Sequence, residues 1–243
     1  MRPLASSGGF CRKSKPPMNR LAQFLLRLTG QLTAEVLVLG GAFVGSFLVF
    51  LYLTRLVFVA GPEQFDQAAF DLMDRLRAAT PGLTQWALRV TFFGSARWFV
   101  VAAVALPALL WWGLKRRREA VEIFAAIAGS ALLNQLLKHF FGRVRPLTAL
   151  IYQPGLSFPS GHSMIGLALY GMLAWQLWRH GRHPFWAVLL VIWALFIGLT
   201  RIYLHVHYAT DVLAGFAAGV AWVVLVQAAV RRRLRRMGQD VRS

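Results

Sequence analysis

The sequence is short of acidic residues and almost free of cysteine. Its 243 residues include nine Asp and Glu against 27 Lys and Arg, and Cys11 is the only cysteine. A single cysteine can form neither an internal disulfide nor a thiolate metal cluster. Mg²⁺ is held by oxygen ligands, above all carboxylates, and no acidic cluster is present to supply them. We therefore expect a protein that works without a metal or other cofactor.

Apolar residues make up 57% of the chain and are gathered into long runs. A run of about 18 or more apolar residues can cross the hydrocarbon layer as a helix. None of the runs alternates with a period of two, as the strands of a membrane barrel would. The sequence predicts an all-α, polytopic membrane protein with six transmembrane helices, at about 36–60, 97–114, 120–141, 163–179, 185–203 and 211–230. Gly41-x-x-x-Gly45 and Gly215-x-x-x-Gly219 would let helix backbones approach closely, although this pattern is common in apolar helices and says little by itself.

The segment between the first two runs, 61–96, is expected to form one or two amphipathic helices at the membrane interface. Phe65, Phe70 and Leu72 alternate there with charged residues, a composition typical of helices that lie in the interface plane. Residues 31–230 would then form one membrane domain, flanked by a basic arm at 1–30, partly disordered, and a basic tail at 231–243. Translation could start at Met1 or Met18.

The net charge of +18 comes from four basic segments, and six spans place all four on one face of the membrane. They are the N-terminal arm, 115–119, 179–183 and the C-terminal tail. Positive segments stay in the cytoplasm, so both termini are expected there, in the inner membrane of a bacterium. No aromatic residues interleave with these blocks, which argues against nucleic-acid binding. Their expected role is orientation of the protein and contact with anionic lipid.

Polar residues gather at the opposite, outer ends of the last four spans. Ionisable groups at membrane depth are costly, so a cluster of them is by default a functional hypothesis. Any one of them could instead be a snorkelling anchor, but three separate segments place such groups on the same side. The cluster holds at least four fixed cations and a single carboxylate, which predicts a site for phosphate. Its members are Lys138, His139, Arg143, Arg145, Ser160, His162, Arg201, His205, His207 and Asp211.

His207 and Asp211 are four residues apart and would share a helix face if the sixth helix started early. A carboxylate that accepts one imidazole N–H fixes the ring tautomer and leaves the other nitrogen free to attack. Asp211 could alternatively cap the sixth helix.

The stretch FPSGHS (158–163) stands at the start of the fourth span. Pro159 and Ser160 predict a helix cap, and Gly161 lets the backbone approach a ligand. The N–H groups at this helix start would bind phosphate oxygens, with His162 beside them for proton transfer.

Three segments together resemble the type 2 phosphatidic acid phosphatase (PAP2) superfamily. KHFFGRVRP (138–146) fits Lys-x6-Arg-Pro, PSGH (159–162) fits the second signature, and TRIYLHVHYATD (200–211) fits Ser-Arg-x5-His-x3-Asp. Thr200 stands where the family usually has Ser, while His139, Arg143 and His205 match no motif position. The resemblance covers about residues 30–230 and, with six spans, points to the integral-membrane branch of the family.

The resemblance implies a role for each matching residue. His207 would be the nucleophile that becomes phosphohistidine, Asp211 would orient its ring, and His162 would be the general acid and then the general base. The phosphate oxygens would be held by Lys138, Arg145, Ser160, Gly161 and Arg201. Fixed cations would replace a metal ion in stabilising the transferred group.

The leading hypothesis is a lipid phosphatase with its site facing the periplasm or exterior. Its substrate would be phosphatidic acid, phosphatidylglycerophosphate or an isoprenyl diphosphate. A lipid phosphotransferase would use the same site with a lipid as acceptor in place of water. A non-catalytic lipid-binding or transport protein would be expected to have lost part of the catalytic set. A vanadate-dependent oxidase is disfavoured because six spans indicate a lipid substrate.

Overall fold

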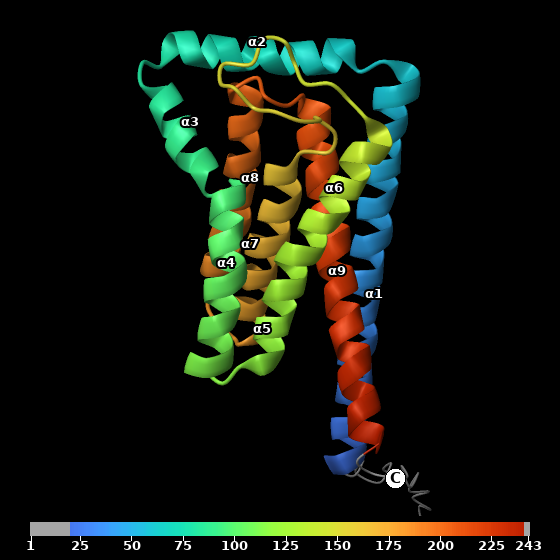
Figure 1. Ribbon diagram of the computed structural model, residues 1–243. Helices are drawn as coiled ribbons and strands as arrows, with labels where there is room; N and C mark the ends of the chain where they lie inside the picture. The colour runs from blue at the N-terminus through green and yellow to red at the C-terminus, as the bar shows by residue number, and fades with distance from the viewer. Residues whose placement is uncertain (1–19, 241–243) are drawn as a thin grey trace, which may run out of the picture. The chain divides into compact units, whose positions relative to one another are not determined.

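The computed structural model describes residues 20–240, with side chains described for residues 36–233 (Figure 1). Over this range the chain is helical and contains no strand, which confirms the all-α prediction. Expectations for residues 1–17, and for where translation starts, fall outside the described residues. The helices are α1 (Arg20–Arg55), α2 (Glu63–Ala79), α3 (Leu83–Phe92), α4 (Ala96–Ala108), α5 (Arg117–Phe124), α6 (Ser130–Phe141), α7 (Gly161–Arg179), α8 (Pro184–Tyr203) and α9 (Ala209–Asp240).

Five helical segments are long and apolar enough to cross a membrane, counting only the residues that the structure describes. The ends of each segment lie within three residues of the ends of one predicted run, because the runs end where charged residues or turn residues begin. Short π-helical turns extend α1 and α4 and join α5 to α6. The five segments are Val36–Ala60, Ala96–Gly113, Arg117–Phe141, Pro184–Tyr203 and Ala209–Arg233.

The remaining predicted run, 163–179, coincides with α7, which packs against α8 and α9 over much of its length. Buried residues lie on every face of α7, as the four consecutive buried residues Gly166 to Leu169 show. A helix enclosed by other helices does not need an apolar surface toward lipid, so it tolerates Gly, Ser and Gln. This explains why α7 is less apolar than the five segments named above.

The contacts divide the chain after Leu39, and the helices from Gly40 onward form one compact unit. Within that unit α9 meets α7 through Gly215 and Gly219. A Cβ at Gly215 would lie 2.7 Å from the Ser160 carbonyl oxygen, and one at Gly219 would lie 2.8 Å from the Met164 carbonyl oxygen. Both distances are too short for a side chain, so the two helix backbones approach closely at this pair, as its spacing allows.

The other glycine pair behaves differently. A Cβ added at Gly41 or Gly45 would meet no atom within 4 Å. This pair therefore makes no close helix contact within the residues that the structure describes. The spacing of two glycines allows such a contact but does not specify which partner helix, if any, faces them.

The segment 61–96 forms two helices, α2 and α3, as the sequence predicted. Asp66 and Phe70 of α2 are buried, whereas Phe65 and Leu72 are exposed. In Figure 1 α2 runs across the ends of α8 and α9, and it contacts both helices. One face of α2 thus covers the turn between α8 and α9.

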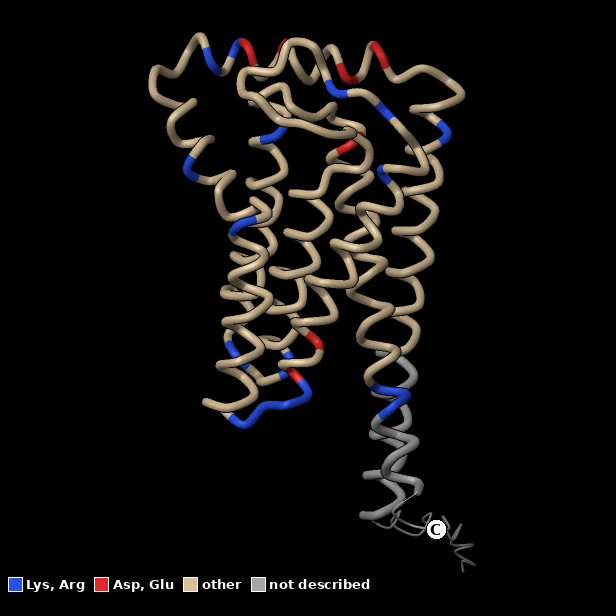
Figure 2. Tube along the Cα trace, in the orientation of Figure 1, with Lys and Arg blue, Asp and Glu red and all other residues tan. Residues whose placement is uncertain are grey.

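At the far end of this unit Lys and Arg residues gather in the turns (Figure 2), beside the buried Glu119 and Glu122. Glu122 is fully buried and pairs with Arg118 at 2.9 Å and with Arg179 at 3.0 Å. A buried charge is tolerated only where it is paired and hydrogen-bonded. Glu122 therefore ties α5 to the end of α7, opposite the polar cluster considered below.

We predict that Gly219→Val destabilises the protein by about 1–3 kcal/mol, the usual effect of overpacking. The branched side chain would force α9 away from the Met164 carbonyl. The measurement is thermal unfolding of the purified protein in detergent. Gly45→Val is the matched control, because nothing lies within 4 Å of that position; equal loss of stability in both variants would contradict the account.

Candidate active site

Three chain segments meet at the α2 end of the helices from Gly40 onward. Helix α6 ends at Gly142, whose left-handed conformation (φ 64°) turns the chain into the loop that leads to α7. Helix α8 ends at Tyr203, and a turn with His207 precedes α9. Between these segments lies a cavity of about 240 Å³. Of the predicted site residues, five line it: Lys138, Arg145, Gly161, His162 and His207.

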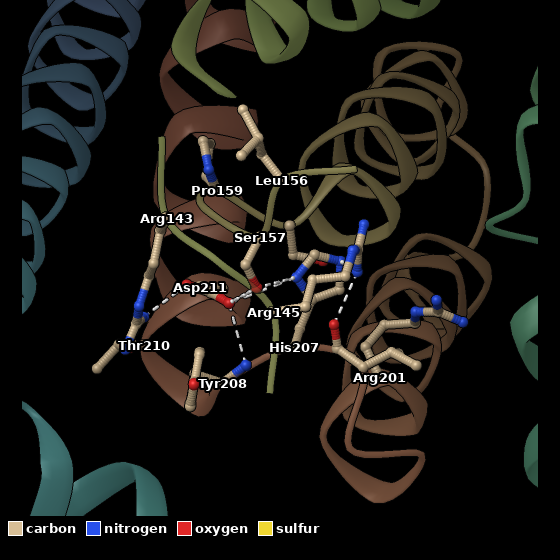
Figure 3. A network of polar contacts seen from close by, with 12 residues as sticks. Arg143, Arg145, Leu156, Ser157, Pro159, Arg201, His207, Tyr208, Thr210 and Asp211 are labelled. Atoms are coloured by element: carbon tan, nitrogen blue, oxygen red, sulfur yellow. Dashed lines mark hydrogen bonds and ion pairs between the residues drawn. The ribbon is translucent and has the colours of Figure 1, made fainter. Parts of the chain in front are cut away.

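His207 and Asp211 lie in contact, and a serine bridges them (Figure 3). His207 Nδ1 is 3.4 Å from Asp211 Oδ2. The hydroxyl of Ser157 donates to the same carboxylate oxygen at 2.5 Å and lies 3.2 Å from His207 Nδ1. The sequence indicated the His207–Asp211 pair through its spacing of four. It gave no signal for Ser157, which belongs to no motif.

Arg145 contacts the other ring nitrogen of His207. Its Nη1 donates to His207 Nε2 at 3.0 Å and to the Val206 carbonyl at 2.7 Å. A guanidinium group can only donate, so Nε2 must carry a lone pair and Nδ1 the proton. Burial, with Arg145 and Lys138 nearby, lowers the pKa of His207 well below its ordinary value. The contact with Arg145 and the lowered pKa both favour a neutral ring with its lone pair on Nε2.

His162 lines the same cavity as His207. Its ring makes no hydrogen bond to any residue that the structure describes. The turn before α4 passes directly over this ring: a Cβ at Gly94 would lie 2.8 Å from His162 Cδ2 and 2.4 Å from Ile197. Gly94 therefore allows α4 to close one side of the cavity while both imidazole nitrogens stay available.

Lys138 and Arg201 donate to neutral groups. Lys138 Nζ donates to the carbonyls of Leu156 and Ser157. Arg201 is 1% exposed and donates to Thr91 at 2.6 Å and to Gln153 at 3.0 Å. Its Nε has no partner. Because neither cation forms an ion pair within the described residues, their charges remain available to an anion.

Helix α7 begins at Gly161, and Ser160 occupies its N-cap position, as predicted, with its backbone carbonyl accepting the Met164 N–H at 3.0 Å. The Ser160 side chain makes no bond to the backbone of the first turn; it accepts a hydrogen bond from the Ser163 hydroxyl at 3.1 Å. The Ser160 N–H donates to the Asp211 carbonyl at 3.0 Å, which joins α7 to α9. Asn134 lies beside Gly161, 3.0 Å from where a Cβ would be.

Asp211 is not the N-cap of α9, because that helix already begins at Ala209. Its carboxylate reaches back to accept the Tyr208 N–H at 3.0 Å, as the third residue of a capping box does. One carboxylate thus contacts both His207 and the start of α9.

The count of one carboxylate in the outer cluster is wrong. Asp66 of α2 also reaches it and pairs with Arg143 at 2.9 Å. Arg143 pairs in turn with Asp211 at 2.6 Å. Single-sequence reasoning could not place Asp66, because nothing in the spacing of segment 61–96 specifies which face of α2 turns toward α9.

The two other histidines of the cluster stand apart from the cavity. His205 stacks on Phe70 of α2, with ring centroids 4.3 Å apart, and its Nδ1 is 3.2 Å from the Thr148 hydroxyl. His139 is exposed, and its Nδ1 lies 2.7 Å from the Gln135 carbonyl oxygen. Neither lines the cavity, in keeping with their place outside the three motifs.

The donors of this site do not suit a metal ion. Within the described part of the chain, no group of three or more His, Cys, Asp and Glu side chains is arranged to hold one. Asp211, the carboxylate nearest the cavity, is already bonded by Arg143 and Ser157. What the cavity offers is cationic donors and two imidazoles, a set suited to a phosphate group.

Comparison with known proteins identifies relatives that match well over half of the chain. The sequence model of the PAP2 superfamily matches residues 119–235. Phosphatidylglycerophosphatase B of Bacillus subtilis is 28% identical over 190 residues, which cover 76% of this chain and 92% of the relative. The Escherichia coli protein YbjG, named provisionally as an undecaprenyl-diphosphatase, is 30% identical over 167 residues, covering 65% of this chain and 79% of the relative.

The fold agrees with these matches. The crystal structure of a transmembrane PAP2-type phosphatidylglycerolphosphate phosphatase from Bacillus subtilis superposes with a TM-score of 0.69 at 28% identity. The alignment covers 78% of this chain and 96% of that structure. Sequence, fold and the three motifs agree, and the chain belongs to the PAP2 superfamily.

Proposed function

We propose that the protein is a membrane lipid phosphatase that forms a phosphohistidine on His207. The observation that carries this proposal is the state of the His207 ring. Its Nδ1 is turned to Asp211 and Ser157, and its Nε2 is turned to Arg145, a residue of the cavity wall. The named activities of its relatives, on phosphatidylglycerophosphate and undecaprenyl diphosphate, support a phosphorylated lipid as the substrate.

In the first step the phosphate group of the lipid enters the cavity. Arg145 then donates to the phosphate oxygens in place of His207 Nε2, which frees the lone pair of Nε2. Nε2 attacks phosphorus, and the bond from phosphorus to the lipid oxygen breaks. His162, protonated, gives its proton to that oxygen, and the lipid leaves as an alcohol or a monophosphate. The negative charge of Asp211 stabilises the imidazole ring as it becomes positive.

In the second step water replaces the lipid. His162, now neutral, accepts a proton from the water as the oxygen attacks phosphorus. The P–N bond breaks, inorganic phosphate is released, and His207 returns to its neutral form. Lys138, Arg145 and Gly161, which line the cavity, hold the non-bridging oxygens through both steps. Arg201 and Ser160 do not line it, and we propose that they support this phosphate site from behind the cavity wall.

The membrane placement follows from charge and hydropathy. We propose six spans, with α7 as the enclosed sixth, and α2 and α3 lying in the interface. The basic turns at 115–118 and 179–183 would then be cytoplasmic together with both termini, in a bacterial inner membrane. The cavity would open at the opposite, periplasmic face. Residues 31–230 would be the membrane domain, between a basic arm and a basic tail.

We predict that His207→Ala lowers phosphate release by about 10³-fold or more, because the nucleophile is lost. The assay uses phosphatidylglycerophosphate, phosphatidic acid and undecaprenyl diphosphate, each in detergent micelles, with release of inorganic phosphate as the readout. The matched control is His139→Ala, an exposed histidine outside the cavity, which should keep the wild-type rate. A folded His207→Ala protein with undiminished release would contradict the proposal.

We also predict that phosphate release persists in excess EDTA, because fixed cations do the work that Mg²⁺ does in other phosphoryl transfers. The measurement is the rate on the same lipids before and after chelation. An EDTA-treated enzyme that recovers its rate only when Mg²⁺ is added would show that a metal takes part.

A further inference from the structure

Two charged residues outside the family motifs stand directly behind the His207–Asp211 pair. Arg143 lies in the loop after α6, and Asp66 lies in the first turn of α2. We propose that Arg143, itself held by Asp66, is a positioning residue that fixes the Asp211 carboxylate against His207. This inference rests on the proposed function, since it assigns a role toward the nucleophile named there.

The Asp211 carboxylate needs a counter-charge. Its side chain is fully buried, and an unpaired buried carboxylate is strongly unfavourable. Within the described residues, Arg143 is the only lysine or arginine that forms an ion pair with it, at 2.6 Å. Ser157 and the Tyr208 N–H both bond Oδ2, whereas Arg143 bonds Oδ1. Both carboxylate oxygens are thus held, and the plane of the group is fixed.

The orientation of Arg143 is fixed in turn from several sides. Its Nη1 donates to Asp211 and to the Thr210 hydroxyl at 2.8 Å, and its Nη2 donates to Asp66 at 2.9 Å. The Tyr208 ring lies under the guanidinium, 4.0 Å from its central carbon. A planar fork can satisfy two carboxylates at once, which a lysine ammonium on a flexible chain cannot do in the same geometry.

Asp66 connects this arrangement to α2. Besides Arg143, its carboxylate accepts the N–H and the hydroxyl of Thr210, both at 2.9 Å. Thr210 precedes Asp211 in the first turn of α9. A side chain of α2 therefore holds both the cation that pairs with Asp211 and the backbone beside it.

Arg143 and Arg145 are two residues apart in the sequence but contact different members of the His207–Asp211 pair: Arg143 contacts Asp211 and Arg145 contacts His207 (Figure 3). Arg145 lines the cavity and contacts His207 Nε2, the attacking atom. Arg143 does not line the cavity, and its donors are taken up by two carboxylates and a hydroxyl. Arg143 therefore acts through Asp211 and not on the phosphate group.

This role predicts which kinetic constant changes. Without Arg143 the Asp211 carboxylate loses its counter-ion and can turn away from His207, so the ring is less well oriented for attack. The phosphate ligands stay in place, so substrate binding is little affected. We expect Arg143→Lys to lower kcat by about 10- to 100-fold with KM within about 3-fold of wild type, the size of effect usual for groups that orient a reacting side chain.

The experiment measures kcat and KM for phosphate release from the three lipids above, in dodecylmaltoside micelles. The variants are Arg143→Lys, Arg143→Ala and Asp66→Asn. Guanidinium ion at millimolar concentration should raise the activity of Arg143→Ala several-fold, and neutral urea should not. Only guanidinium supplies both the missing positive charge and the planar set of N–H donors. Asp66→Asn keeps the Arg143–Asp211 pair and should show a smaller loss of kcat than Arg143→Ala.

Arg77→Gln is the matched control for α2. Arg77 ties the same helix to the Tyr203 carbonyl at 2.5 Å and lies over the Tyr203 ring, without touching Asp211. It should lower thermal stability and leave kcat near the wild-type value. Wild-type kcat in folded Arg143→Lys and Arg143→Ala would overturn the positioning role, as would an equal loss of kcat in Arg77→Gln.

The His207→Ala variant in the same assay separates the two proposals. Release that is lost in His207→Ala but unchanged in the Arg143 variants would overturn the positioning role alone. Release that survives in His207→Ala would overturn the proposed function, and the role of Arg143 with it.

Discussion

The structure depends on one buried carboxylate. Asp211 contacts His207, Ser157 and Arg143 through its side chain, and the start of α7 through its carbonyl oxygen. These partners come from the loop after α6, from α7 and from the turn before α9. A buried charge must be compensated wherever it lies, so burying Asp211 fixes the segments that surround it. His207, the carboxylate beside it and the start of α7 are therefore placed by a single constraint.

Around this carboxylate the site carries an excess of positive charge. Lys138 and Arg201 are bonded to carbonyl, hydroxyl and amide oxygens, which orient them without neutralising them. This excess of positive charge makes binding of a phosphate group favourable. Without an anion nearby, the same charges are uncompensated and unfavourable. The close contact of α7 with α9 at Gly215 and Gly219 brings the start of α7 beside Asp211.

The sequence predicted the helices well, because apolar run length and charge decide where a helix can cross lipid. The sequence also predicted that His207, Asp211 and His162 lie close together, because six spans place the helix ends that carry the three motifs on one face of the membrane. It missed Ser157, Asp66 and the pairing of Arg143, which depend on how a loop folds and on which face of α2 turns inward. Ser160 takes the predicted N-cap position, but its hydroxyl bonds Ser163 and its N–H bonds Asp211, contacts that no local pattern specifies.

The central claim is that His207 carries the phosphoryl group between the two steps. It is tested most directly by rapid acid-free quenching of the enzyme with lipid labelled in its phosphate, followed by mapping of the labelled peptide. The account predicts a label that is stable to alkali, labile to acid and bound to the peptide that contains His207. A label on another residue, or turnover with no labelled enzyme at any time under single-turnover conditions, would contradict it.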